Sequence, residues 1–440
     1  MNNVPDKSST GYRERARAAL RGGDTALAEK SYGHVLEICP DDLEALQQLA
    51  DIDIHHGASE QAIERLLAAH RAHPENAAVL HKLGVARTAA GDFRGAVADL
   101  RLGLKLAPNM FLARLRLGML LDQLGETHDA LIASFMAINT AQARGRWLSD
   151  ETTAAEYRET VKQAMQYVDA GRRRLFDAVL EPLRQRYGKS ELGRVEQCLA
   201  IYLDEQVATL PDPRQKPKFL YFPGVPSQPY YPRERFPWQA ELEAHTAMIR
   251  EELHAVLSQP QDLESFLQTD SPQDAADLLR SSTSQQAAWD AYFFHRHGER
   301  YDAHGVRCPQ TAALLDSIPL VQVREHSPET LFSVLRPGTH ILPHRGVTNT
   351  RLVTHLPLLV PPDCALRVGG ETHVWQEGCC VSFDDTFEHE AWNNSGETRV
   401  VLILDSWNPD LSEAERAAVA DLVGAIGDFN RECELPTPKG

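Results

Sequence analysis

Residues 331–335 read LFSVL and residues 339–351 read THILPHRGVTNTR, and with these two runs the chain changes character. More short, apolar, β-rich runs follow, separated by Gly, Pro, Asn and Asp: LVTHLPLLV (352–360), ALRVG (365–369), GCCVSF (378–383) and TRVVLILDSW (398–407). Short strands at this spacing, with turn residues between them, are typical of a β-sandwich or barrel. The chain after about residue 330 is therefore predicted to form such a domain.

Two histidines and an arginine stand out within these runs. His344 lies in the second run, His389 follows 45 positions later in FDDTFEHEAW, and Arg399 opens the last strand. Histidines near strand ends can meet at the mouth of a barrel, and a nearby arginine can bind a carboxylate with its forked donors. This layout is typical of non-haem iron oxygenases, which hold Fe(II) with two histidines and usually one carboxylate. The carboxylate is expected two residues after the first histidine, but that position is Gly346.

Several motifs closely resemble those of the aspartyl/asparaginyl β-hydroxylases, a family known for lacking the carboxylate ligand. They are LFSVLRPGTHILPHRG, TNTRLVTHLPLLVPP, FDDTFEHEAWN and RVVLILDSWNPDL, within a resemblance that covers roughly residues 218–425. The resemblance implies a double-stranded β-helix (jelly-roll, cupin-like) domain with flanking helices. It also implies a 2-oxoglutarate-dependent dioxygenase, similar to the peptide-aspartate β-dioxygenases, with Fe(II) as metal, 2-oxoglutarate as cosubstrate and O2 as oxidant.

The resemblance implies roles for individual residues. It makes His344 and His389 the iron ligands. The residues that it places around 2-oxoglutarate are Arg399 at the distal carboxylate, Ser333 beside Arg399, His355 at the carboxylate near the metal, and Trp289 at the pocket edge. Arg351 is a candidate for binding an acidic substrate or for ordering the pocket.

The chain departs from the animal members of the family at the cosubstrate and substrate end of the site. Val353 replaces an arginine and Leu331 replaces a lysine, so two cations are missing. Gly305 and Ala312 replace a pair of cysteines, so the disulfide that those enzymes can form is absent. The oxygenase chemistry is thus better supported by the sequence than an aspartyl substrate is.

Other polar and aromatic residues near the motifs are expected to be structural. They are His340 and His373 as ordinary polar residues, Asp384 and Asp385 as turn-forming residues that support the metal ligands, and Trp392 and Trp407 as packing residues. The seven cysteines are scattered, without the paired CxxC spacing of a zinc site, and are expected to be reduced thiols.

The N-terminal third repeats every 34 residues. The series in this register are Gly23, Gly57, Gly91 and Gly125; Ala28, Ala62, Ala96 and Ala130; Pro40, Pro74 and Pro108; and Gly84 with Gly118. Glycine suits the turn within a helix pair, alanine allows close packing, and proline separates successive pairs. The pattern resembles the tetratricopeptide repeat, although the early tryptophan of the full consensus is missing.

The predicted fold class is α+β, with a tetratricopeptide solenoid before the β-helix domain. The expected segments are a disordered tail at 1–9, repeats at 10–140, a helical connector at 141–215 and the catalytic domain at 216–440. The formal net charge of −17 argues against nucleic acid as a partner. The polar start MNNVPDKSST and the lack of an apolar run of about 18 residues predict a cytoplasmic protein without a membrane span.

The expected reaction is hydroxylation of an aspartyl or asparaginyl residue, or of a related amino acid, with formation of succinate and CO2. Two alternatives stay open. The substrate can be a non-peptide acyl chain or another small molecule, or the chain can be a catalytically silent module whose repeat binds a protein. The expected partners are a peptide, protein or small amino-acid-like substrate, and a protein in the groove of the solenoid.

Overall fold

The computed structural model describes residues 8–267, 278–282 and 287–434. The expected tail at 1–9 lies outside these residues except for Ser8 and Ser9, which cap and begin the first helix. The chain divides into two compact units, with the boundary between Arg172 and Arg173.

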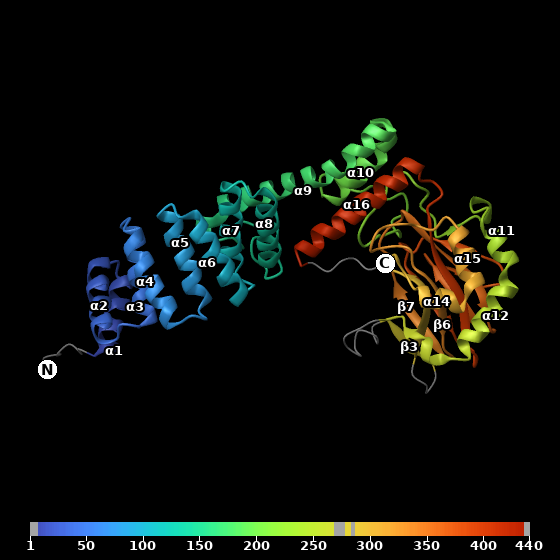
Figure 1. Ribbon diagram of the computed structural model, residues 1–440, viewed down its shortest axis with the longest axis horizontal. Coiled ribbons are helices and arrows are strands. Elements are labelled where there is room, and N and C mark those ends of the chain that lie inside the picture. The colour runs from blue at the N-terminus through green and yellow to red at the C-terminus, as the bar shows by residue number, and fades with distance from the viewer. Residues whose placement is uncertain (1–7, 268–277, 283–286, 435–440) are drawn as a thin grey trace. The chain divides into compact units, whose positions relative to one another are not determined.

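The first unit is a stack of helix pairs (Figure 1). Its helices are α1 (Ser9–Arg21), α2 (Thr25–Ile38), α3 (Leu43–His55), α4 (Ser59–Ala72), α5 (Ala77–Ala89), α6 (Phe93–Leu106), α7 (Phe111–Gln123) and α8 (Thr127–Gln142). Each odd-numbered helix packs against the next one, and each pair packs against its successor. This arrangement confirms the predicted helical repeat.

The 34-residue period reflects two local requirements. The turn glycines Gly23, Gly57, Gly91 and Gly125 have φ between 75° and 81°, a conformation that favours glycine. Gly84 allows helices α5 and α6 to approach closely, because a Cβ at this position would lie 2.8 Å from Cγ of Leu100. Aspartates such as Asp92 cap the second helix of a pair by accepting a hydrogen bond from a backbone N–H.

Helix α9 (Arg158–Tyr187) contains the boundary between the units, within the segment expected as a connector. The second unit then adds helices α10 (Gly193–Tyr202), α11 (Gln239–Ala244), α12 (Thr246–Leu257), α14 (Asp302–Arg307), α15 (Pro309–Ser317) and α16 (Glu413–Glu432). Among the described residues, no helix is both long enough and apolar enough to cross a membrane.

Two antiparallel sheets form the second unit, as predicted for a β-sandwich. The larger sheet has the order β1 (Tyr230–Tyr231), β11 (Val381–Phe383), β8 (Arg351–Leu359), β13 (Arg399–Trp407), β6 (Thr330–Leu335), β4 (Trp289–Arg296) and β2 (Glu264–Ser265), with β5 (Glu299–Arg300) beside β4. The smaller sheet has the order β10 (Glu371–His373), β9 (Cys364–Val368), β12 (His389–Asn393), β7 (Thr339–His344) and β3 (Leu279–Ser281).

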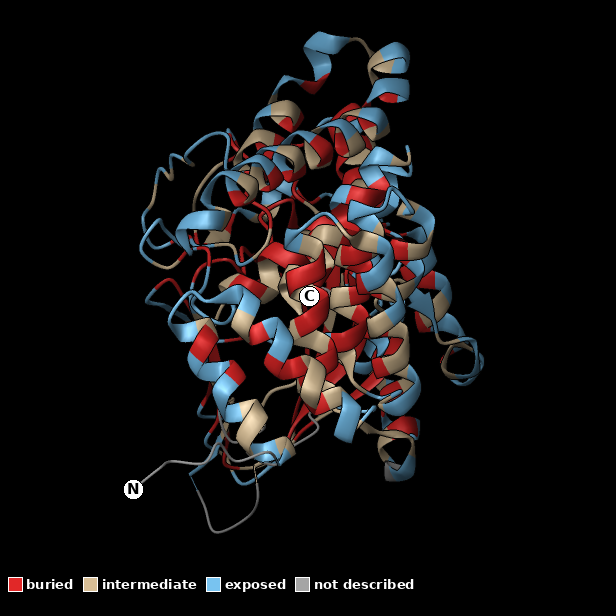
Figure 2. Ribbon diagram, turned by 90° about the vertical axis from the view of Figure 1, so that its left-hand side faces the viewer, coloured by how far each residue is buried: buried red, intermediate tan, exposed pale blue. Residues whose placement is uncertain are grey.

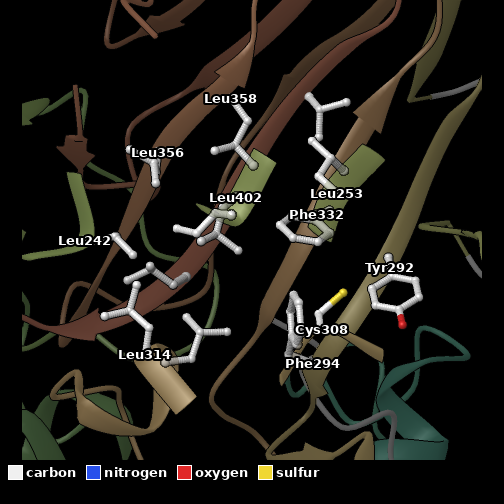
Figure 3. Packing of buried hydrophobic residues seen from close by; sticks show 14 of the residues in the cluster. Leu242, Leu253, Tyr292, Phe294, Cys308, Leu314, Phe332, Leu356, Leu358 and Leu402 are labelled. Carbon is white, nitrogen blue, oxygen red and sulfur yellow. The ribbon is translucent and has the colours of Figure 1, made fainter. Parts of the chain in front are cut away.

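Because side chains alternate along each strand, the larger sheet has one face that packs against helices and one face that points toward the smaller sheet. Phe332, Leu356 and Leu402 pack against Leu253 of α12 and Leu314 of α15 in a buried cluster, as Figure 3 shows. The helices that face the viewer in Figure 2 alternate between buried and exposed residues along their length. The opposite face of the larger sheet holds Ser333, Arg351, His355 and Arg399, because these residues occupy odd-numbered positions of β6, β8 and β13.

Candidate active site

The antiparallel pairing of β7 with β12 brings the two predicted metal ligands together. His344, at the end of β7, is the register partner of His389, at the start of β12. Their ring centroids lie 4.1 Å apart. Two histidines that are 45 positions apart in the sequence are therefore direct neighbours across two strands.

Backbone carbonyls orient both imidazole rings. Nδ1 of His344 is 2.8 Å from the carbonyl oxygen of Leu342, and Nδ1 of His389 is 3.1 Å from that of Phe387. With Nδ1 as the donor, Nε2 keeps its lone pair and is the atom available to a metal. Burial lowers the pKa of both rings, which favours the neutral, ligating form. The donor set thus fits a divalent transition metal such as Fe(II).

Gly346 stands where a third protein ligand is expected, and the structure shows why no side chain fits there. A Cβ at Gly346 would lie 2.1–2.3 Å from the carboxylate atoms of Asp385. The carboxylate of Asp385 therefore occupies the space of the missing side chain, and its Oδ1 is buried without a hydrogen-bond partner. In the described part of the chain, no cluster of three or more His, Cys, Asp or Glu residues forms a metal site.

The adjacent Asp384 has a structural environment. Its carboxylate accepts hydrogen bonds from the backbone N–H and the hydroxyl of Thr386 and from the side chain of Gln215. Burial raises its pKa to about 7. Asp384 thus stabilises the turn before His389, whereas Asp385 faces the cavity beside Gly346.

Arg399 lies in the same cavity and is 1% exposed. Its Nη1 is 3.4 Å from both the carbonyl and the hydroxyl oxygen of Ser333, and its guanidinium lies 5.0 Å from the ring of Trp375. Its Nε has no hydrogen-bond partner, and no carboxylate pairs with it among the described residues. Burial lowers its pKa to about 10. A buried cation without a counter-ion is costly, so this position fits an anionic ligand.

Trp289, Ser333 and His355 lie around Arg399, as the sequence predicts. The indole Nε1 of Trp289 donates a hydrogen bond of 2.9 Å to Oγ of Ser333. His355 is 6% exposed, and its Nδ1 is buried without a partner. Burial, and then the charge of Arg399, lower the pKa of His355 well below its usual value. These groups form a small polar cradle next to the histidine pair.

Arg351 has an environment that the sequence does not reveal. Its Nη1 lies 3.1 Å from Oδ2 of Asp385 and 3.1 Å from Oδ1 of Asp405. All three side chains are at most 8% exposed. Burial raises the pKa of Asp405 to about 6. The candidate for binding an acidic substrate is thus already paired with two carboxylates.

All seven predicted site residues line one cavity of about 300 Å³ between the two sheets. Sequence reasoning missed Asp405 and Phe266, which also line it. Asp405 lies six positions after Arg399 on the same strand, so strand alternation places both on one face and is the signal that could have found it. His340 is absent from the cavity and instead bonds to Glu390 at 2.6 Å, as expected for a structural residue.

The segment before β1 is bonded to both loops that carry the histidines. The backbone N–H of Lys216 donates to the carbonyl of Thr386, and that of Lys218 donates to the carbonyl of Gly346. Leu220 forms a parallel bridge with Thr348. The residues just before β1 therefore hold the edge of the candidate site.

Comparisons with known proteins agree with this geometry. Residues 243–409 match the family described as Aspartyl/Asparaginyl beta-hydroxylase. The chain is 31% identical over 255 residues to "Aspartate beta-hydroxylase domain-containing protein 2" of Rattus norvegicus, which covers 56% of this chain and 70% of that protein.

Two further relatives are named for different activities. The "Ornithine lipid ester-linked acyl 2-hydroxylase" of Rhizobium tropici is 35% identical over 198 residues, or 44% of this chain and 66% of that protein. The human "Aspartyl/asparaginyl beta-hydroxylase" is 32% identical over 200 residues, or 44% of this chain and 25% of that protein. A solved structure of MamA protein covers 46% of this chain at 21% identity with a TM-score of 0.32.

The matched regions contain the histidine pair, the buried arginine and the sandwich that positions them. Together, the 70% coverage of the rat relative and the match over 243–409 establish the relationship. The chain belongs to the aspartyl/asparaginyl β-hydroxylase family.

Proposed function

We propose that the chain is an Fe(II)- and 2-oxoglutarate-dependent dioxygenase that hydroxylates an unactivated carbon. The observation that carries the proposal is the pairing of two neutral, carbonyl-anchored histidines with a buried Arg399 that has no counter-ion. Fe(II) and 2-oxoglutarate, when bound, supply the chemistry that activates O2 and breaks the C–H bond.

The residues of the chain bind and orient these groups. His344 and His389 hold the metal through Nε2. Arg399 and the hydroxyl of Ser333 bind the distal carboxylate of 2-oxoglutarate, and Trp289 fixes that hydroxyl. His355 contributes its free Nδ1 near the other end of the cosubstrate. Asp385 places a negative charge beside the metal ligands without being one of them.

The test is anaerobic binding of Fe(II) and 2-oxoglutarate to the full-length chain, followed by succinate formation in air. A charge-transfer absorption band marks chelation of the 2-oxo acid by Fe(II). His344→Ala and His389→Ala are expected to abolish the band, whereas His340→Ala, on the same strand as His344, retains it. Arg399→Met is expected to weaken 2-oxoglutarate binding by at least about tenfold, because it removes charge-assisted hydrogen bonds.

The opposite result would leave the chain without catalysis. If neither Fe(II)-dependent binding of 2-oxoglutarate nor succinate formation occurs, the chain is a silent module and its helical repeat is the functional part. A protein partner that binds the helical repeat is a separate proposal. Its test is to compare the binding of a candidate partner protein to the full-length chain with its binding to variants substituted on helices α1–α8.

Two substrate classes come from the family. The name of the human relative suggests an aspartyl or asparaginyl residue, and the name of the Rhizobium tropici relative suggests an acyl chain. Succinate formation stimulated by Asp- or Asn-containing peptides would support the first class, and stimulation by acyl substrates would support the second.

A further inference from the structure

A single tryptophan is buried in an otherwise exposed loop near the candidate site. The loop spans residues 374–380 and joins β10 to β11. Val374 is 71% exposed and Gln376 is also exposed, whereas Trp375 between them is only 5% exposed. The indole packs in a cluster with residues of both sheets, among them Leu366 and Val401. The loop therefore delivers one aromatic ring to the interior of the sandwich.

Hydrogen bonds fix this loop to strand β8, which carries His355. The backbone N–H of Gly378 donates to the carbonyl of Pro357 at 2.9 Å. The carboxylate of Glu377 accepts a hydrogen bond of 2.8 Å from the backbone N–H of Val360. The position of Trp375 is thus set by the same strand that presents His355 to the cavity.

The indole covers the guanidinium of Arg399. The Cζ atom of Arg399 lies 5.0 Å from the centroid of the Trp375 ring, within the roughly 6 Å of a cation–π contact. The other contacts of the guanidinium are weak, because Nη1 is 3.4 Å from both oxygens of Ser333 and Nε has no hydrogen-bond partner among the described residues. The aromatic face is therefore the main contact that holds the guanidinium in place.

A purely structural role does not explain why this residue is a tryptophan. The Nε1 of Trp375 is buried and has no hydrogen-bond partner in the described part of the chain. An unpaired buried N–H group is unfavourable, and a leucine or phenylalanine would fill the space without that cost. Indole, however, binds a cation through its ring face better than any other side chain. The unpaired N–H and the contact with Arg399 together point to a role in holding the cation.

We propose that Trp375 positions Arg399 and thereby sets the length of the 2-oxo dicarboxylic acid that the site accepts. The inference rests on the proposed function, in which Arg399 binds the distal carboxylate of 2-oxoglutarate. The histidine pair fixes one end of the cosubstrate and the guanidinium fixes the other. The indole prevents the guanidinium from moving away from the histidine pair, so a longer diacid does not fit between the two ends.

Replacement of Trp375 by leucine removes the aromatic face and leaves space behind the guanidinium. Arg399 then gains rotational freedom that cosubstrate binding has to remove, so the Kd for 2-oxoglutarate should rise about tenfold. 2-Oxoadipate, which is one methylene longer, gains room, and the preference for 2-oxoglutarate over it should fall at least about fivefold. Trp375→Phe keeps an aromatic face and should change the Kd by no more than about threefold.

The test is an anaerobic titration of the full-length chain and Fe(II) with each diacid, followed by the charge-transfer band. The wavelength of the band at saturation should stay the same in all variants, because Trp375 does not contact the metal ligands. Trp392→Leu is the matched control: Trp392 lies 6.0 Å from the guanidinium of Arg367 and, among the described residues, is not one that lines the cavity. Phe294→Leu controls for lost core volume, since Phe294 is 2% exposed in the cluster on the helix side of the sheet.

Both controls should keep the Kd values of the unsubstituted chain. If Trp375→Leu does not fold, Trp375→Met, which also lacks an aromatic face, replaces it in the comparison with Trp375→Phe. An unchanged preference between the two diacids, equal losses in the aromatic and aliphatic variants, or the same shift in either control would overturn the role of Trp375 alone. Absence of the band in the unsubstituted chain would instead overturn the proposed function.

Discussion

Replacement of Arg351 by methionine is expected to destabilise the second unit more than any exposed ion pair does. Methionine keeps most of the volume but leaves Asp385 and Asp405 without their shared cation. Both carboxylates are at most 8% exposed. Removing one partner of a buried ion pair typically costs about 3–5 kcal/mol, because the remaining charge is uncompensated. We expect Arg351→Met to lower the free energy of unfolding by this amount at pH 7.

Urea unfolding followed by tryptophan emission measures the effect. Five of the six tryptophans, at 238, 289, 375, 392 and 407, lie in the second unit, so the emission change reports mainly on that unit. Arg300→Met is the matched control, because Arg300 also contacts two carboxylates, those of Asp302 and Asp316. These three side chains are 46–85% exposed, and such surface pairs contribute only about 0–1 kcal/mol.

The pH dependence of the loss provides a second check. Burial raises the pKa of Asp405, and without Arg351 this carboxyl loses the cation that lowers its pKa, so Asp405 takes up a proton as the pH falls and the uncompensated charge disappears. The deficit of Arg351→Met should therefore shrink between about pH 7 and pH 4. A loss no larger than that of Arg300→Met, or a deficit that is constant with pH, would refute the reasoning.

Three more outcomes follow from individual contacts. Gly91→Ala should destabilise the first unit by about 1 kcal/mol, because the φ of Gly91 is 80°. Gly33→Ala within helix α2 should instead stabilise it by about 0.5–1 kcal/mol. Far-UV circular dichroism during thermal unfolding measures both changes in stability, and changes of the same sign would contradict the reasoning. Trp289→Phe removes the hydrogen bond to Ser333. This change should raise the KM for 2-oxoglutarate about fivefold, equivalent to about 1 kcal/mol, with little change in kcat. A change in kcat alone would argue against a role of Trp289 in positioning Ser333 for 2-oxoglutarate. Burial raises the pKa of Asp405 to about 6, above the roughly 3.9 of an unfolded chain, so folding takes up a proton between these pH values and the free energy of unfolding falls as the pH rises from about 4 to 6. Asp405→Asn should reduce this decline by up to about 3 kcal/mol. If the urea midpoints of the variant keep the same slope against pH, this assignment is wrong.

The helical repeat was predictable because its determinants are local. Each helix pair of the repeat needs a turn glycine with positive φ and a small residue where its helices cross, so the same sequence pattern recurs in every pair. The β-rich runs were predictable for a related reason, since alternation and turn residues act over a few positions. The domain boundaries proposed from composition stay predictions, and the contact pattern divides the chain inside the expected connector, at 172 and 173.

The site was predictable only as a set of residues. The resemblance selects His344, His389 and Arg399, and the structure brings all three into one cavity. The double pairing of Arg351 was not predictable, because Asp405 is 54 positions away and reaches it through the register of β8 with β13. The same non-local pairing places Ile403 beside His355, and the pairing of β13 with β6 places Leu331 on the other side of Ile403. Composition carries no information on such neighbours, so these contacts emerge only in three dimensions.

The bonded segment at 215–220 has a practical consequence for dissecting this protein. The family match begins at residue 243, and a fragment cut there would contain all seven candidate site residues. Such a fragment would lose the donors to the carbonyls of Gly346 and Thr386, the side chain that holds Asp384, and strand β1 at the edge of the larger sheet. Expression boundaries for crystallisation or assay should therefore lie upstream of Asp212, so that the truncated protein keeps the chain that ties down both histidine loops.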